Sequence, residues 1–170
     1  FESENVEIEN KKFLSLLNKV RISISNDDTR HYLNGIFFHL SEIEGQYFLT
    51  GVATDSHRLS SSSILVKNSY QFSPFILPRK TVYQLSTLLS ENKQNVNILI
   101  GENKVQFTIG KIRLISKVID GKFPDYKKVV PSDNNKSLIV PCKDFITSIE
   151  RVTSVSLDRK EGVKLTVSKS

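Results

Sequence analysis

The sequence predicts an α+β protein whose sheets are built from antiparallel strands. Two segments carry apolar residues at the spacing of an amphipathic helix, and the segments between and after them alternate short apolar runs with turn signals. The predicted elements therefore follow the order helix, strands, helix, strands. Strands joined by short turns pair in antiparallel fashion, and this order is typical of the α+β class.

The first predicted helix lies close to residue 10 and buries one apolar stripe. The stripe recurs at i, i+3, i+4 and i+7, and it is formed by Phe13, Leu16, Leu17 and Val20. Lys11 and Lys19 fall away from the stripe, and the chain has no Asp or Glu from residue 10 to residue 26. We therefore expect a purely basic outer face, which suits contact with a phosphate backbone.

Turn signals separate the predicted strands. Glu44-Gly45-Gln46 lies between two apolar runs and predicts a hairpin, and Gly101-Glu102-Asn103-Lys104 predicts a second one. The second helix is expected to open at Pro78-Arg79-Lys80, because proline is well tolerated at a helix start. Its buried stripe is formed by Val82, Leu85, Leu88 and Leu89. The strands are predicted at residues 35–40, 47–53, 59–66, 74–77, 96–100, 105–109 and 112–119.

A strand-then-helix unit occurs three times in the chain. Leu77-Pro78-Arg79-Lys80 aligns with Val140-Pro141-Cys142-Lys143, and Ile8-Glu9-Asn10-Lys11 has the same shape without the proline. We therefore expect duplicated units. The expected organisation of the chain is a linker remnant at residues 1–6, a domain at 7–125, a linker at 126–136 and part of a related domain at 137–170. Because the chain has no methionine and ends in a strand-like run, we expect it to be a piece of a longer protein.

Composition narrows the class of protein. The formal net charge of +6 favours a polyanionic partner, although a solvated lysine-rich surface would give the same charge. No apolar run reaches the length of a membrane span, and the single cysteine, Cys142, excludes an internal disulfide. We expect a cytoplasmic protein without a membrane partner. Because no glycine-rich phosphate loop or Cys/His metal spacing occurs, we also expect neither a cofactor nor a metal.

The segment Val52-Ala53-Thr54-Asp55-Ser56-His57-Arg58-Leu59 runs from an apolar strand into a polar turn. One alternative is a small hydrolase or metal-dependent enzyme that uses Asp55 and His57, since alternation along a strand would put both on one face. Such an enzyme still needs a nucleophile or a third ligand. The other alternative is the polar wall of a binding groove, in which Asp55 accepts backbone donors of its own turn. A domain that reads DNA sequence lacks a recognition-helix motif here.

Four motifs in consistent order resemble the bacterial sliding clamp, the beta subunit of DNA polymerase III. They are Tyr32-Leu33-Asn34-Gly35, the segment from Val52 to Leu59, Pro78-Arg79-Lys80 and Phe123-Pro124-Asp125-Tyr126. The resemblance implies the DNA-clamp fold, with antiparallel sheets and two helices per domain. It implies a homodimer ring around duplex DNA, with residues 7–125 as the middle domain and 137–170 as part of the third. It also implies a processivity factor that is not an enzyme.

The same resemblance assigns two sets of site residues. A groove would bind short linear peptides of the DNA polymerase catalytic subunit, the clamp loader and repair proteins. Its wall would be formed by Leu33, Thr54, Ser56, His57, Arg58, Leu59, Pro124, Lys128 and Val129. Ser56 stands where the family usually has glycine, and Lys128 where it often has arginine. Our candidates for contact with DNA are Lys11, Lys12, Lys19, Arg30, His31, Tyr32, Arg79 and Lys80. Taken singly, Leu33 and Val129 could be ordinary core, and Arg58 could simply pair with Asp55.

Overall fold

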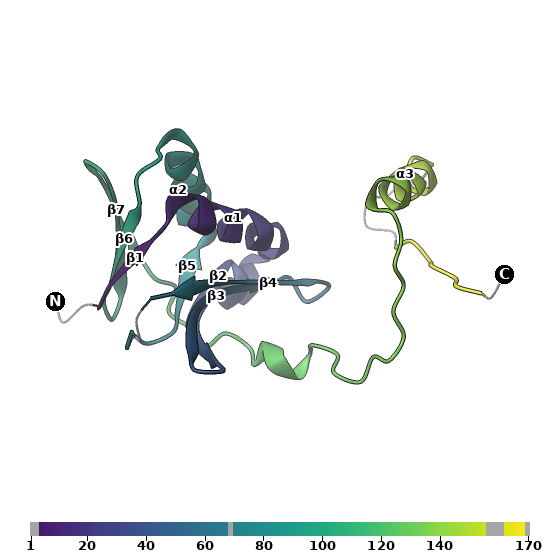
Figure 1. Ribbon diagram of the computed structural model, residues 1–170, viewed down its shortest axis with the longest axis horizontal. Coiled ribbons are helices and arrows are strands. Elements are labelled where there is room, and N and C mark those ends of the chain that lie inside the picture. Colours follow the sequence, from purple (N-terminus) through teal and green to yellow (C-terminus); the bar gives the residue numbers. More distant parts are fainter. Residues whose placement is uncertain (1–3, 68–69, 156–161, 169–170) are drawn as a thin grey trace. The chain divides into compact units, whose positions relative to one another are not determined.

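The computed structural model describes residues 4–67, 70–155 and 162–168 (Figure 1). The chain divides into two compact units, one up to Tyr126 and one from Lys127 onward. The first unit holds all the strands of the described residues, and the described part of the second holds one α-helix.

Two four-stranded sheets form the first unit, and every strand pairing in them is antiparallel. The first sheet has the order β1-β6-β7-β8 and is built from β1 (Glu4–Ile8), β6 (Val96–Ile100), β7 (Lys104–Ile109) and β8 (Ile112–Lys117). The second has the order β4-β3-β2-β5 and is built from β4 (Leu59–Val66), β3 (Gln46–Thr54), β2 (Gly35–Ile43) and β5 (Phe75–Pro78). The α+β prediction is confirmed.

Two helices, α1 (Asn10–Val20) and α2 (Arg79–Glu91), pack against each other and against the second sheet (Figure 1). Phe13 of α1 joins the two sheets, because its ring lies 6.1 Å from the ring of Phe38 in β2 and 6.2 Å from that of Phe107 in β7. Gly51 allows this close packing, since a Cβ atom there would meet Leu16 at 2.8 Å. Both helices thus bury their apolar stripes in one core, as the sequence predicts. Neither they nor any other described helix has the length and apolar character that crossing a membrane requires.

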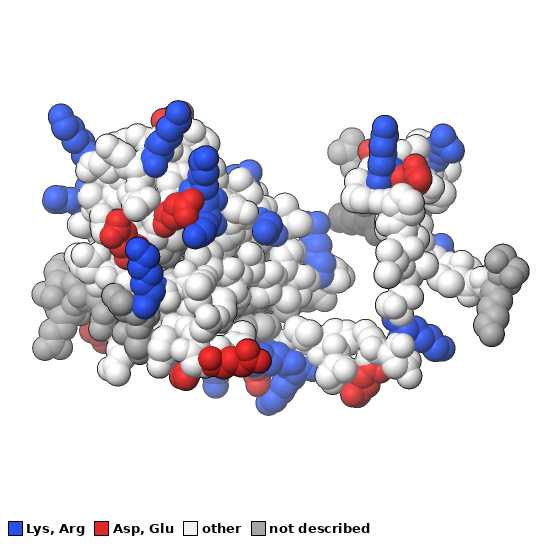
Figure 2. Space-filling model, in the orientation of Figure 1, with Lys and Arg blue, Asp and Glu red and all other residues white. Residues whose placement is uncertain are grey.

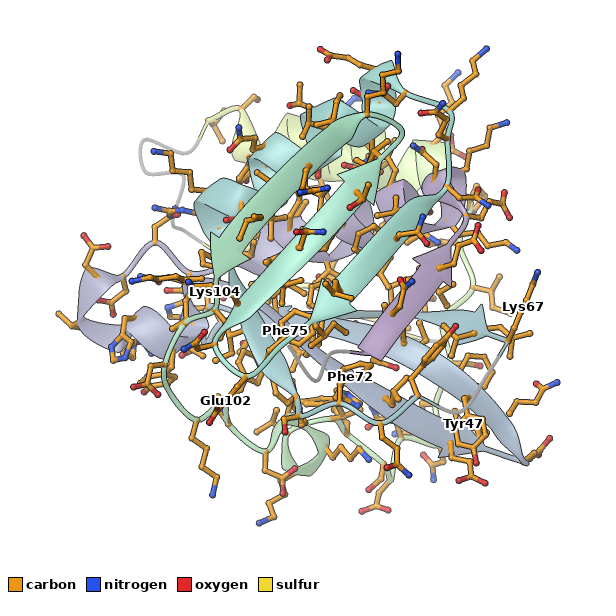
Figure 3. All side chains as sticks on the ribbon, turned by 90° about the vertical axis from the view of Figure 1, so that its left-hand side faces the viewer. Tyr47, Lys67, Phe72, Phe75, Glu102 and Lys104 are labelled. Atoms are coloured by element: carbon orange, nitrogen blue, oxygen red, sulfur yellow. The ribbon has the colours of Figure 1, made fainter. Side chains whose placement is uncertain are left out.

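Aromatic side chains close the core near the start of β5. Phe75 stacks on Phe38 at 5.4 Å and contacts Phe72 at 6.0 Å. Figure 3 shows Phe72 and Phe75 below the first sheet, and Lys104 near the β6–β7 turn. Lys104 therefore provides an exposed charge in the first sheet, on a different element from those that form the polar turn after β3.

Several boundaries differ from the predicted ones. Glu4, Asn5 and Val6 belong to β1 and pair with β6, so the linker remnant expected at residues 1–6 is wrong for these three. The cause is burial: the side chain of Val6 is 0% exposed. The strand expected at residues 112–119 ends at Lys117, although Ile119 still forms one isolated bridge.

The second unit contains the helix α3 (Cys142–Thr153), which the repeat predicts. Within residues 127–155 and 162–168 it contains no strand, so the strands expected before α3 and at residues 164–168 are not formed. The last two residues of that expected strand, 169 and 170, lie outside the described residues. A strand is stabilised by hydrogen bonds to a neighbouring strand, and this unit supplies none in its described part. Accordingly, no apolar side chain of α3 is fully buried, and two are exposed, Ile146 at 49% and Val152 at 58%.

Candidate functional site

The turn between β3 and β4 is held in shape by the carboxylate of Asp55. Its Oδ1 accepts hydrogen bonds from the backbone N–H groups of His57 and Arg58, each at 3.0 Å. Its Oδ2 accepts from Nε of Arg58 at 3.1 Å. Thr54 also stabilises the turn, because its hydroxyl donates to the backbone oxygen of Arg58 at 2.8 Å. The structure confirms that Asp55 accepts the backbone donors of its own turn.

These contacts also bear on the enzyme alternative. Partial burial would by itself raise the pKa of Asp55, but the hydrogen bonds from His57 and Arg58 outweigh it and hold the pKa below its ordinary value. A carboxylate with a lowered pKa and both oxygens engaged is a weak base. Among the described residues, no three His, Cys, Asp or Glu side chains gather where a metal could bind. The pair of Asp55 and His57 is therefore poorly suited to either form of catalysis.

Ser56 has an unusual backbone conformation within this turn. Its φ angle is +75°, in the left-handed region that glycine adopts freely and other residues rarely adopt. The side chains of Ser56, His57 and Arg58 are all exposed. The turn therefore presents a hydroxyl, an imidazole and a guanidinium to solvent on a backbone whose shape is fixed from within.

An apolar cluster lies beneath this turn. Its buried members are Leu33, Val52, Ile76 and Phe123, and Tyr32, Phe37, Leu59, Ile119 and Tyr126 pack against them. The rings of Phe37 and Phe123 stack in parallel at 4.8 Å. We call these residues the second cluster. Buried Phe123 anchors its segment in this cluster, and the next residue, Pro124, is exposed beside it.

Leu33 and Leu59 contribute differently to the second cluster. The side chain of Leu33 is only 3% exposed, so it supports the wall from inside and offers little surface of its own. Leu59 is half-buried and retains some exposed apolar surface. Sequence reasoning missed Phe37, Val52 and Ile76 as parts of this region. The alternation of β2 could have pointed to Phe37, because residues on the outer face of a strand recur with a period of two.

A contact between His39 and Tyr126, which the sequence did not predict, anchors the end of the first unit. His39 donates from Nδ1 to the backbone oxygen of Leu40 at 3.0 Å, and its Nε2 accepts from the hydroxyl of Tyr126 at 2.9 Å. Burial, with a smaller effect of the Asp125 charge, raises the pKa of Tyr126 above its ordinary value. Tyr126 is therefore a neutral donor at physiological pH, and it holds the chain at the boundary between the two units.

The structure places the predicted groove residues in two groups. Leu33, Thr54, Ser56, His57, Arg58, Leu59 and Pro124 lie in the first unit, on and around the β3–β4 turn and the second cluster. Lys128 and Val129 lie in the second unit, where both are exposed. The seven residues of the first group therefore lie together in one compact unit.

The basic residues of α1 form an open surface. Lys11, Lys12 and Lys19 are exposed, and together with Ser62 and Ser63 of β4 they line a shallow hollow of about 400 Å³. Figure 2 shows Lys and Arg side chains over the region of α1 and α2, with some acidic groups among them. One such acid is Glu9, which pairs with Lys12 at 3.0 Å although both side chains are more than half exposed. The outer face of α1 is thus basic, but its first turn has an acidic neighbour.

The other candidates for DNA contact are engaged within the fold to different extents. The guanidinium of Arg79 donates to the side-chain oxygen of Asn26. His31 donates from Nε2 to the backbone oxygen of Asp120 at 3.1 Å, and Tyr32 packs edge-on against His31 at 5.9 Å. Lys80 is exposed at the start of α2. Arg30 is engaged by the side chains of Asp27 and Ser56.

Comparison with known proteins assigns this fold to a family. The family model for the central domain of the DNA polymerase III beta subunit matches residues 7–125. The beta sliding clamp of Caulobacter vibrioides (strain NA1000 / CB15N) is 36% identical over 166 residues, which cover 97% of this chain and 45% of the relative. That of Escherichia coli (strain K12) is 34% identical over 155 residues, which cover 91% of this chain and 41% of the relative. The chain therefore spans about half the length of these curated relatives.

Solved structures give the same result. The Bartonella birtlesii sliding clamp bound to griselimycin has a TM-score of 0.86 at 38% identity, over 91% of this chain and 42% of that one. A Caulobacter crescentus clamp, with PEG bound at a region assigned to β-motif tethering, has a TM-score of 0.89 at 34% identity, over 92% and 42% of the two chains. These similarities confirm the clamp fold expected from the sequence, and they support a clamp rather than an enzyme built on Asp55 and His57. The chain belongs to the family of bacterial sliding clamps, the beta subunits of DNA polymerase III.

Proposed function

We propose that this chain acts as part of a sliding clamp, a DNA polymerase processivity factor that encircles duplex DNA as a homodimer ring. In this role it is a non-catalytic accessory subunit that works in the cytoplasm, without a cofactor. Membership of the clamp family supports the proposal. The proposed domain organisation follows from it, with residues 7–125 as the middle domain, 126–136 as a linker and 137–170 as part of the third domain.

The observation that carries the partner-binding role is the pre-formed wall around the β3–β4 turn. Asp55 fixes the backbone of this turn, and His57 and Arg58 extend from it into solvent. Half-buried Leu59 and exposed Pro124 add apolar surface beside these polar side chains. A wall that combines apolar surface with a few polar groups suits a short peptide, whose apolar side chain would lie on that surface while its polar groups meet the exposed side chains of the turn.

We propose that the partners of this wall are short linear peptides of the polymerase catalytic subunit, the clamp loader and repair proteins. Lys128 and Val129, in the segment that follows Tyr126, are proposed as further contacts of these peptides. Griselimycin is bound to the Bartonella birtlesii clamp, and we propose that it binds this chain at the β3–β4 wall. It therefore provides a defined probe.

The DNA-binding role rests on the exposed lysines of α1. Lys11, Lys12 and Lys19 offer exposed charges on long side chains, and Lys80 adds one at the start of α2. Contacts of this kind to phosphate give affinity without reading bases, so no position along the duplex is preferred. That property is what a sliding ring requires.

The test of the groove is a calorimetric titration of griselimycin into the 170-residue chain and its variants. His57→Ala and Arg58→Ala should weaken binding while the protein stays folded, because both side chains are exposed. Each substitution should cost about 1–3 kcal/mol, the range for leaving a polar partner unpaired. Lys104→Ala, which removes an exposed charge from β7 in the first sheet, is the matched control and should bind as the unmodified chain does. Equal affinity in all four proteins would exclude the β3–β4 turn as the binding wall.

A further inference from the structure

The β3–β4 turn is in contact with a second segment, the short 3-10 helical segment Asp28–Leu33 with its N-cap Asp27. The two segments share an apolar base, because Leu33 at the end of one and Leu59 just after the other both belong to the second cluster. They also share a polar contact above this base, in which the side chains of Arg30 and Ser56 meet. The turn is therefore held from outside as well as from within.

The guanidinium of Arg30 is fixed in two directions. Its Nε donates to Oδ2 of Asp27 at 2.9 Å, and its Nη1 donates to the hydroxyl oxygen of Ser56 at 2.5 Å. Asp27 is itself oriented, since its Oδ1 accepts from the backbone N–H of Thr29 at 2.9 Å and from the Thr29 hydroxyl at 2.6 Å. A planar guanidinium suits such a double contact, because its donors point in fixed directions.

Ser56 is the residue whose backbone most needs outside support. A left-handed φ of +75° is unfavourable for a residue with a Cβ atom, and the contact with Arg30 is one that a glycine at this position could not make. The backbone N–H of Ser56 donates to the hydroxyl of Thr54 at 3.2 Å, which adds a local contact. The next two residues along the chain are His57 and Arg58, so the conformation of Ser56 determines where their side chains begin.

We propose that Arg30 is a positioning residue of the groove wall: by binding the Ser56 hydroxyl it holds the left-handed turn that presents His57 and Arg58 to the peptide. This role replaces the contact with DNA that we expected of Arg30 from the sequence. It rests on the proposed function of the turn as a peptide-binding wall. The pair of Arg30 and Ser56 is therefore a positioning feature of this chain's groove wall.

The contact itself is tested by amide hydrogen exchange in the 170-residue chain. Ser56→Ala keeps the Cβ atom but removes the acceptor, and Arg30→Ala removes the donor. Both should speed exchange of the His57 and Arg58 amides roughly fivefold, the change expected when one exposed hydrogen bond of ordinary strength is lost. Amides of β6 and β7 in the other sheet should be unchanged, which shows that the variants are folded. Unchanged exchange in the turn would overturn the proposal whatever the ligand does.

The effect on the groove is tested by griselimycin titration of the same variants. Arg30→Ala and Ser56→Ala should each weaken affinity about fivefold, and the double variant should be no weaker than either single one, because both remove the same contact. A double variant that loses the product of the two effects would show that Arg30 acts by another route and would overturn the proposal.

Two further comparisons separate this proposal from the function on which it rests. If His57→Ala binds griselimycin normally, the groove assignment fails, whereas amide exchange still reports the contact between Arg30 and Ser56. If His57→Ala weakens binding and Arg30→Ala does not, only the positioning role fails. Binding to a short DNA duplex tests whether Arg30 contacts DNA instead. Arg30→Ala should leave the salt dependence of DNA affinity unchanged, whereas Lys19→Ala should reduce its slope by about one. An equal reduction by both would return Arg30 to the DNA-contacting residues.

Discussion

The β3–β4 turn and the outer face of α1 both expose charged side chains, but they hold them in different ways. In the turn, Asp55 binds two backbone N–H groups and the guanidinium of Arg58, and Ser56 is bound by Arg30. On α1, Lys11 and Lys19 line an open hollow, and Lys12 makes an exposed pair with Glu9. One surface is fixed by short-range hydrogen bonds and the other is free to adjust.

This difference matches the two tasks proposed for the molecule. A short peptide is selected by groups held in one arrangement, because fixed groups lose little freedom on binding and leave a wrong partner unpaired. A duplex that must slide is better held by flexible charges, which follow the phosphates without favouring one register. The comparison teaches that exposure alone does not identify a recognition site. The hydrogen bonds that fix the backbone beneath the exposed side chains do identify it.

The largest expected effect follows from removing the centre of the fixed surface. Asp55→Ala deletes the acceptor of three hydrogen bonds and leaves two backbone N–H groups to water. We expect it to lower the free energy of unfolding by about 2 kcal/mol and to abolish measurable griselimycin binding, since His57 and Arg58 lose their fixed positions. Urea denaturation and calorimetry measure the two effects.

A matched control for this experiment is Asp28→Ala, which removes a carboxylate whose side chain is exposed in the neighbouring 3-10 segment. It should change the free energy of unfolding by less than about 0.5 kcal/mol, as surface substitutions usually do. If Asp55→Ala is as mild as this control, the turn is not held in place by its carboxylate.

A smaller effect is expected on the flexible surface, and it should differ between two lysines of one helix. Lys19→Ala should reduce the salt slope of duplex binding by about one and weaken binding equally for all DNA sequences. Lys12→Ala should do less, because Glu9 already neutralises part of its charge. Titrations of a short duplex at several salt concentrations compare them. Identical losses for both variants would show that the pair with Glu9 has no influence on DNA binding.

The two regions also differ in how far the sequence predicts them. The stripe of α1 follows from spacing alone, because a helix brings i, i+3 and i+4 together whatever surrounds it. Asp55 could be assigned to its turn for the same reason, since its partners are two and three residues away. The contact between Arg30 and Ser56 could not be predicted, because 26 residues separate them and tertiary packing, including the second cluster, brings the segments together.

Strands depend still more on distant partners. The predicted strands of the first unit formed because β2 pairs with β3 and β5, and β6 pairs with β1 and β7. In the second unit α3 formed, since a helix satisfies its own backbone, whereas residues 137–141 and 162–168 did not form strands. Local patterns therefore predicted helices in both units and strands only where the chain supplied neighbours.

The most direct test of the division between a fixed wall and a flexible basic face is nuclear magnetic resonance of the isotope-labelled chain with each ligand in turn. A short duplex should shift the amide signals of α1, including Lys11, Lys12 and Lys19, and leave those of residues 54–58 in place. Griselimycin should shift the signals of residues 54–58 and leave α1 in place. If the duplex instead shifted the β3–β4 turn, or griselimycin shifted α1, the two surfaces would not have the separate roles assigned to them.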